Sequence, residues 1–114
     1  MRFVELVNSP YLQVYPDSGN LMNASLEPGA KNVYEDIELG RGHIVAAHLK
    51  ETIPGHYREI PFGTGQIDFK RMVDTFLSIG VNRFTGEFWY VGQENWLEDI
   101  KFANQFLRSH FPNK

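Results

Sequence analysis

The sequence predicts a parallel α/β fold, equivalent to about three β/α units of a TIM (β/α)8 barrel, and three observations support this. Candidate helices and strands alternate along the 114 residues, an order typical of parallel sheets with right-handed crossovers. The apolar run at 44–49 lacks alternation, as in strands covered on both faces. A barrel of about 250 residues has about 31 residues per unit, so a chain of this length holds about three units. We therefore predict one partial barrel domain over residues 1–114.

The first half of the chain is predicted to contain two helices and two strands. Residues 1–7 have the pattern of an amphipathic helix end. A short strand is expected at 11–15, followed at 17–20 by a turn with helix-capping chemistry. A short helix at 32–39 then precedes the apolar strand at 44–49. Because the chain starts on a helix whose own strand would lie upstream, we expect it to be a fragment of a larger barrel.

The second half is predicted to contain a third strand between two further helices. Apolar residues recur at helical spacing over 69–77, with Asp68 placed to cap the start and Gly80 the end. The aromatic segment 83–90 is the expected third strand. The last helix is expected to begin after Asn95, which starts a variant of the capping box.

Composition and charge restrict the class of function. The chain carries 11 basic and 14 acidic residues, a net charge of −3, so it lacks the basic footprint of a nucleic-acid binder. It has no cysteine, which excludes disulfides and a thiolate metal site. No apolar run approaches the roughly 20 residues that span a bilayer. We expect a cytoplasmic protein that acts on a small molecule, without nucleic acid or membrane.

Three ionisable residues lie where the predicted strands end. Asp17 follows the first strand, His48 ends the second, and Glu87 lies on the third, each about one β/α unit apart. Parallel α/β folds place functional groups at the carboxyl ends of strands, so these side chains are expected to converge on one rim. Two carboxylates and an imidazole suit a divalent metal such as Mn²⁺, Zn²⁺ or Co²⁺.

Each of these residues also has a purely structural interpretation. Asp17 can serve only as the N-cap of the turn that follows it, and His48 can be a hydrogen-bonded core histidine. Glu87 is harder to explain in that way, because the aromatic residues 88–90 follow it and a buried carboxylate needs a partner. The shared position at strand ends, rather than any single residue, favours a site.

Four short motifs lie along the chain in a fixed order. They are Tyr15-Pro16-Asp17-Ser18-Gly19-Asn20, His48-Leu49-Lys50-Glu51-Thr52, Pro61-Phe62-Gly63-Thr64-Gly65 and Glu87-Phe88-Trp89. Together they resemble the L-ribulose/L-xylulose 5-phosphate 3-epimerase family of xylose-isomerase-like barrels, over nearly the whole chain. The resemblance implies the C-terminal portion of such a barrel. Glu51 stands where the family more often has aspartate, and Thr64 where it has an acidic residue.

The resemblance also implies roles for individual residues. Asp17, His48 and Glu87 would be three of four metal ligands, and Glu87 one of two bases that epimerise C3 of a ketopentose 5-phosphate through an enediolate. Arg58 would contact the substrate. The substrate phosphate would meet either Lys50 or the backbone of 63–65, and the residues leave that choice open.

The fourth ligand, a glutamate, would lie upstream of Met1 in such a barrel. We therefore expect the 114 residues alone to lack one ligand and one base and to be an incomplete epimerase. Open strand edges further predict self-association. Two alternatives remain: an epimerase or isomerase of non-phosphorylated ketoses, and a non-catalytic barrel fragment that acts only in oligomerisation.

Overall fold

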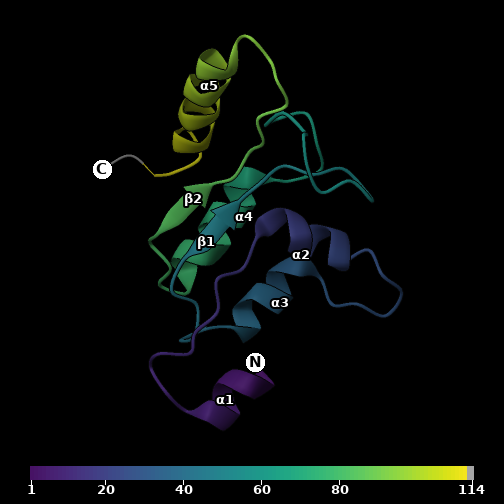
Figure 1. Ribbon diagram of the computed structural model, residues 1–114. Helices are drawn as coiled ribbons and strands as arrows, with labels where there is room; N and C mark the ends of the chain where they lie inside the picture. The colour runs from purple at the N-terminus through teal and green to yellow at the C-terminus, as the bar shows by residue number, and fades with distance from the viewer. Residues whose placement is uncertain (113–114) are drawn as a thin grey trace.

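The computed structural model describes residues 1–112 and has a small parallel sheet with helices packed against one face (Figure 1). In chain order the elements are α1 (Arg2–Val7), α2 (Ser18–Ala24), α3 (Val33–Leu39), β1 (Ala47–Leu49), α4 (Phe69–Ser78), β2 (Phe84–Gly86) and α5 (Trp96–Arg108). Helix α4 lies behind the two strands, whereas α1 and α5 lie at opposite ends of the molecule. The expected alternation of helices and parallel strands is present from α3 to α5, whereas α1, α2 and α3 follow one another without a strand between them.

The strands are shorter than the sequence predicts. The expected strand at 11–15 is not a strand, because it makes only one isolated parallel bridge, Val14 with Ile44. A second isolated bridge, Asp17 with His48, follows this segment. Pro16, which has no N–H to donate, lies between these bridges. The strand predicted at 44–49 is reduced to β1, because β2 begins opposite Ala47. The strand predicted at 83–90 is reduced to β2, because the chain leaves the sheet after Glu87 donates its N–H to the Leu49 carbonyl.

Helix α4 and the helix-facing side of the sheet form the core. The apolar stripe predicted for this helix is confirmed, and its members Phe69, Met72, Val73 and Phe76 are buried. They form one cluster with Ala47 and Leu49 of β1 and with residues of α3 and α5. Burying a side chain of this size contributes about 1.5–3 kcal/mol, so this layer is the main source of stability.

Capping explains where the helices begin and end. Asp68 accepts the Arg71 N–H at 3.0 Å, and Gly80 follows α4 with a φ of 88° that favours glycine. Asp17 caps α2, which the sequence predicts only as a turn. The capping box predicted at Asn95 is wrong, because its side chain makes no cap bond. Its ψ of 21° departs from the extended backbone that an N-cap residue adopts.

Helix α5 lies against β2 at a glycine. A Cβ on Gly86 would lie 2.8 Å from Leu107 Cδ1, so a side chain at this strand position would require Leu107 to move. Leu107 and Ala103 are the buried residues of the helix. Since side chains alternate along a strand, Gly86 and Leu49 face the helices, and His48 and Thr85 face the opposite side.

Candidate functional site

Asp17, His48 and Glu87 lie together at the carboxyl end of the strands, on the face that no helix covers. One ligand atom of each lies within 4.8 Å of the others. His48 Nδ1 is 3.0 Å from Glu87 Oε2 and 3.8 Å from Asp17 Oδ2. His48 is the central residue of β1, Asp17 bridges to it, and Glu87 directly follows β2. The convergence expected from the strand ends is therefore present in the structure.

Lys50 contributes a buried positive charge beside the two carboxylates. Its Nζ lies 3.4 Å from Asp17 Oδ2 and 3.8 Å from Glu87 Oε1, and its side chain is 8% exposed. The same ammonium donates a hydrogen bond to Asn20 Oδ1 at 2.9 Å. A lysine is rarely buried without such partners. Lys50 is thus part of the cluster, and nothing in the sequence indicates that its side chain is buried.

The motif 17–20 docks α2 onto the end of β1. The Ser18 hydroxyl donates to the Lys50 carbonyl and accepts the Lys50 N–H, both at 3.0 Å. A Cβ on Gly19 would collide with the Thr52 side chain, so the helix approaches this closely only with glycine. These contacts fix the position of Asp17, at the start of α2, relative to His48.

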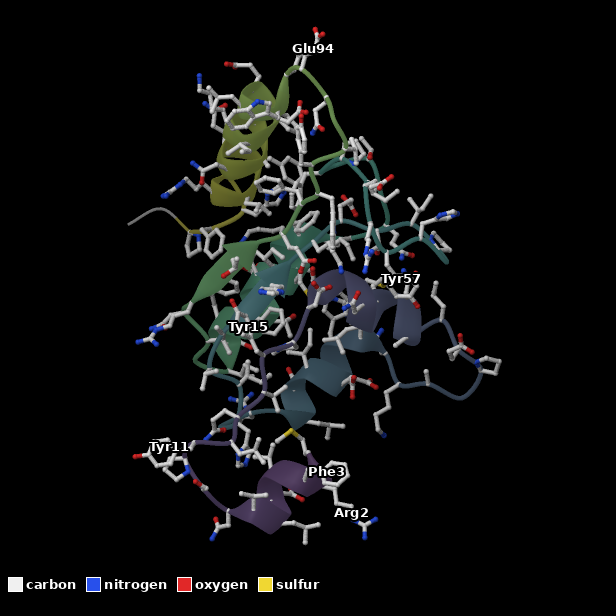
Figure 2. The ribbon with its side chains drawn as sticks, viewed as in Figure 1. Arg2, Phe3, Tyr11, Tyr15, Tyr57 and Glu94 are labelled. Atoms are coloured by element: carbon white, nitrogen blue, oxygen red, sulfur yellow. The ribbon has the colours of Figure 1, made fainter. Side chains whose placement is uncertain are left out.

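An open pocket surrounds the cluster. It is lined by Tyr15, Asp17, Asn20, His48, Lys50, Tyr57, Arg58, Glu87 and Trp89. The Arg58 guanidinium carbon lies 4.3 Å from the centre of the Trp89 ring, a cation–π contact. Tyr15 packs its ring 4.4 Å from that of His48, and Figure 2 shows Tyr15 against the strands and Tyr57 beside α2. Arg58 is therefore at the same pocket as the cluster.

The loop at 63–65 offers little to a phosphate. Gly63 donates its N–H to Glu51 Oε2 at 3.0 Å, and Thr64 donates its N–H to the Pro61 carbonyl. The other oxygen of Glu51 accepts N–H groups from Thr52 and Ile67. These two loop N–H groups are thus already bonded within the protein. Glu51 itself is a buried structural anchor of the loop.

The donor set fits a divalent metal. Asp17 Oδ1 accepts the Asn20 N–H at 2.8 Å, whereas Asp17 Oδ2 is buried and makes no hydrogen bond. Lys50 lies at ion-pair distance from Oδ2 without hydrogen-bonding geometry. A buried carboxylate oxygen that accepts no hydrogen bond has a lone pair available to a metal ion. Two carboxylates and one imidazole nitrogen are ligands that Mn²⁺, Zn²⁺ and Co²⁺ accept.

Comparison with known proteins agrees with this architecture. Residues 1–110 match the family model described as xylose isomerase-like TIM barrel. The chain belongs to this family. The predicted fold class, part of a TIM (β/α)8 barrel, is therefore confirmed.

Individual relatives carry epimerase names. The chain is 32% identical over 108 residues to the L-ribulose-5-phosphate 3-epimerases UlaE of Salmonella paratyphi A and Salmonella typhimurium, covering 94% of this chain and 36% of each relative. A solved structure of L-ribulose 3-epimerase superposes with a TM-score of 0.60 at 20% identity, covering 96% of this chain and 40% of that one. The chain thus spans little more than a third of these curated relatives.

Among residues 1–112, no helix is long and apolar enough to cross a membrane.

Proposed function

We propose that this chain takes part in the metal-dependent 3-epimerisation of a ketopentose 5-phosphate, L-ribulose 5-phosphate or L-xylulose 5-phosphate. The observation that carries the proposal is the cluster of Asp17, His48 and Glu87 beside a buried Lys50. Its support from relatives is the 32% identity to proteins named L-ribulose-5-phosphate 3-epimerase.

Epimerisation at C3 removes a proton next to the C2 carbonyl and returns one to the opposite face. Negative charge then develops on the oxygens of the resulting enediolate. A divalent metal, held by Asp17, His48 and Glu87, supplies Lewis-acid stabilisation of that charge. The open pocket around these residues gives the substrate access to them.

Glu87 is the proposed base of this chain. Its Oε2 lies against His48, whereas its Oε1 lies on the Lys50 side of the carboxylate. We assign the proton transfer at C3 to Oε1. A single side chain cannot reach both faces of one carbon, so the reaction needs a second base. We assign that second base to no residue of this chain, which aligns to 36% of its relatives' length.

Arg58 and Lys50 are the proposed substrate contacts. Arg58 is exposed at the pocket and stacked on Trp89, so its remaining N–H donors are free to meet substrate oxygens. Lys50 is buried beside the carboxylates and donates to Asn20. Its ammonium suits a substrate oxygen bound close to the cluster, the phosphate included.

Metal binding by the purified chain tests the proposal first. Asp17→Asn keeps a side-chain oxygen for the α2 cap but removes a charged ligand. Asp68→Asn is the matched control, because Asp68 caps α4 outside the cluster. Calorimetric titration with Zn²⁺, Mn²⁺ and Co²⁺ is expected to show binding to the parent chain and to Asp68→Asn, and none to Asp17→Asn. Equal binding by all three proteins would contradict the assignment.

Substrate assays separate the alternatives. Incubation in D₂O with Zn²⁺ and either L-ribulose 5-phosphate or free L-ribulose reports proton exchange at C3 by NMR. Robust epimerisation by the 114 residues would show that the site needs no further unit. Preference for the free sugar would favour an enzyme of non-phosphorylated ketoses. A chain that self-associates but binds neither metal nor sugar would be a non-catalytic fragment.

A further inference from the structure

Helix α2 and its N-cap residue carry polar side chains at three-residue intervals. Asp17 belongs to the candidate metal cluster, and Asn20 accepts the hydrogen bond from Lys50. The next residue in this series is Asn23, which is buried and does not line the pocket. Residues three apart lie on the same side of a helix, so one short helix contacts the cluster and a further group at once.

Asn23 holds the turn that precedes Arg58. Its Oδ1 accepts the Gly55 N–H at 3.2 Å, and its Nδ2 donates to the His56 carbonyl at 3.4 Å. The side chain of Gln66 donates to the same Oδ1 at 2.9 Å, and it also donates to Thr52 Oγ1 at 3.0 Å. Asn23 is therefore bonded to both sides of the loop that runs from 52 to 66.

The loop between these contacts carries exposed residues to the pocket. The structure describes no helix or strand between β1 and α4. Backbone hydrogen bonds close the 53–56 turn, from the His56 N–H to the Ile53 carbonyl, and join Gln66 to Thr52. The side chain of Asn23 ties this turn to α2. Glu59 adopts a φ of 63°, a left-handed conformation that is unfavourable for a residue with a Cβ. Arg58 directly precedes it and stacks on Trp89. Strain of this kind persists only where surrounding contacts impose it.

We propose that Asn23 is a positioning residue, which fixes the 53–56 turn so that Arg58 stays over Trp89 at the edge of the cluster. The role of Arg58 as a substrate contact rests on the proposed function, whereas its placement by Asn23 does not. An arginine held in one arrangement before substrate arrives loses less conformational freedom on binding. Helix α2 then links the cluster to the arginine, through Asp17 at its start and Asn23 one residue before its end.

A purely structural role for Asn23 predicts something different. If Asn23 only stabilised α2, its loss would lower the stability of the whole chain without a specific effect at Arg58. Tryptophan fluorescence distinguishes these roles, because the chain has two tryptophans and Trp96→Phe leaves Trp89 as the single reporter. Arg58→Ala in this background gives the emission of Trp89 without its cation.

The experiment compares Asn23→Ala with Asn32→Ala in the Trp96→Phe background. Asn32 caps α3 through the Tyr34 N–H, so its variant loses a helix-associated bond that does not involve the loop. Asn23→Ala is expected to shift Trp89 emission to the value of Arg58→Ala. It should also speed amide hydrogen exchange at Gly55 by about tenfold, the effect of losing one hydrogen bond. Asn32→Ala should leave both measurements unchanged.

Gln66→Ala is the second variant, and it keeps the result interpretable if Asn23→Ala fails to fold by circular dichroism. It removes the bond that orients Asn23 and should change both measurements in the same direction, by less. Parent-like emission and exchange in the folded variants, with a clear change in Arg58→Ala, would overturn the proposal. These outcomes require neither metal nor turnover, so they remain decisive even if the proposed epimerisation fails.

Discussion

The two faces of the small sheet differ in what they bury and what they expose. On the helix-facing side, Ala47 and Leu49 are buried against α4. On the opposite side, Tyr15 is half exposed and His48 faces an open pocket. Because side chains alternate along a strand, successive residues of β1 lie on opposite faces, one in the core and one at the pocket. Stability comes from one face, and the chemistry that the residues allow comes from the other.

The largest expected effect is on the buried face. Phe76→Ala should lower the free energy of unfolding by about 3–5 kcal/mol, because it removes a fully buried ring and leaves a cavity. Urea denaturation measures this loss, and metal titration of the folded fraction should give the parent affinity. A loss below about 1 kcal/mol would mean that the layer of α4 is not the main source of stability.

On the open face, His48→Asn is expected to affect metal binding rather than stability. Metal affinity is expected to fall by more than about 100-fold, beyond the effect of altering an outer-shell partner of a metal ligand. The free energy of unfolding should change by less than about 1 kcal/mol, because the side chain is one-third exposed. His43→Asn is the control, since His43 lies outside the cluster. Calorimetry with Zn²⁺ and urea denaturation provide the two measurements.

Glu51 is a charged residue on the buried side of the sheet, so it tests whether a buried polar group there also contributes to stability. Glu51→Gln should reduce the free energy of unfolding by about 1–3 kcal/mol, since the new amide N–H group faces backbone N–H donors. The rate of amide hydrogen exchange at Gly63 should rise in the same variant. The exposed Glu27→Gln should change neither measurement. An unaltered Gly63 exchange rate in Glu51→Gln would show that this carboxylate does not anchor the loop.

The smallest effect is expected on the outer surface of α4. Lys70 and Asp74 form an ion pair at 2.6 Å, yet both side chains are more than half exposed. Lys70→Ala should change the free energy of unfolding by less than about 0.5 kcal/mol, because water and salt screen such pairs. Denaturation at low and high salt measures this, and a loss above about 1 kcal/mol would contradict it.

The sequence predicts the site better than it predicts the elements that carry it. Helix α4 is predicted correctly because its apolar stripe has a clear period. The meeting of Asp17, His48 and Glu87 follows from their positions at strand ends, even though the strands themselves are shorter than expected. The length of a strand depends on where its neighbouring strand pairs with it. The periodicity of a single segment carries no information about that neighbour.

Helix α2 and the burial of Lys50 are beyond local prediction for a related reason. Residues 18–20, Ser-Gly-Asn, are weak helix formers, so propensity favours a turn. The helix forms where the Ser18 hydroxyl hydrogen-bonds to the backbone of Lys50, a residue 32 positions further along the sequence. The same docking covers the Lys50 side chain. Such tertiary contacts override local preference.

The arrangement of the loop between β1 and α4 has a consequence for how the protein can vary. Its anchors, Thr52, Gly55, Gly63 and Gln66, are held by buried polar side chains, whereas residues 57–59 are exposed between them. Exchanges or insertions at 57–59 alter the wall of the pocket and leave these anchors in place. The wall of the pocket can therefore change at this tip by a few substitutions, without changes to the sheet or to the residues that meet at its rim.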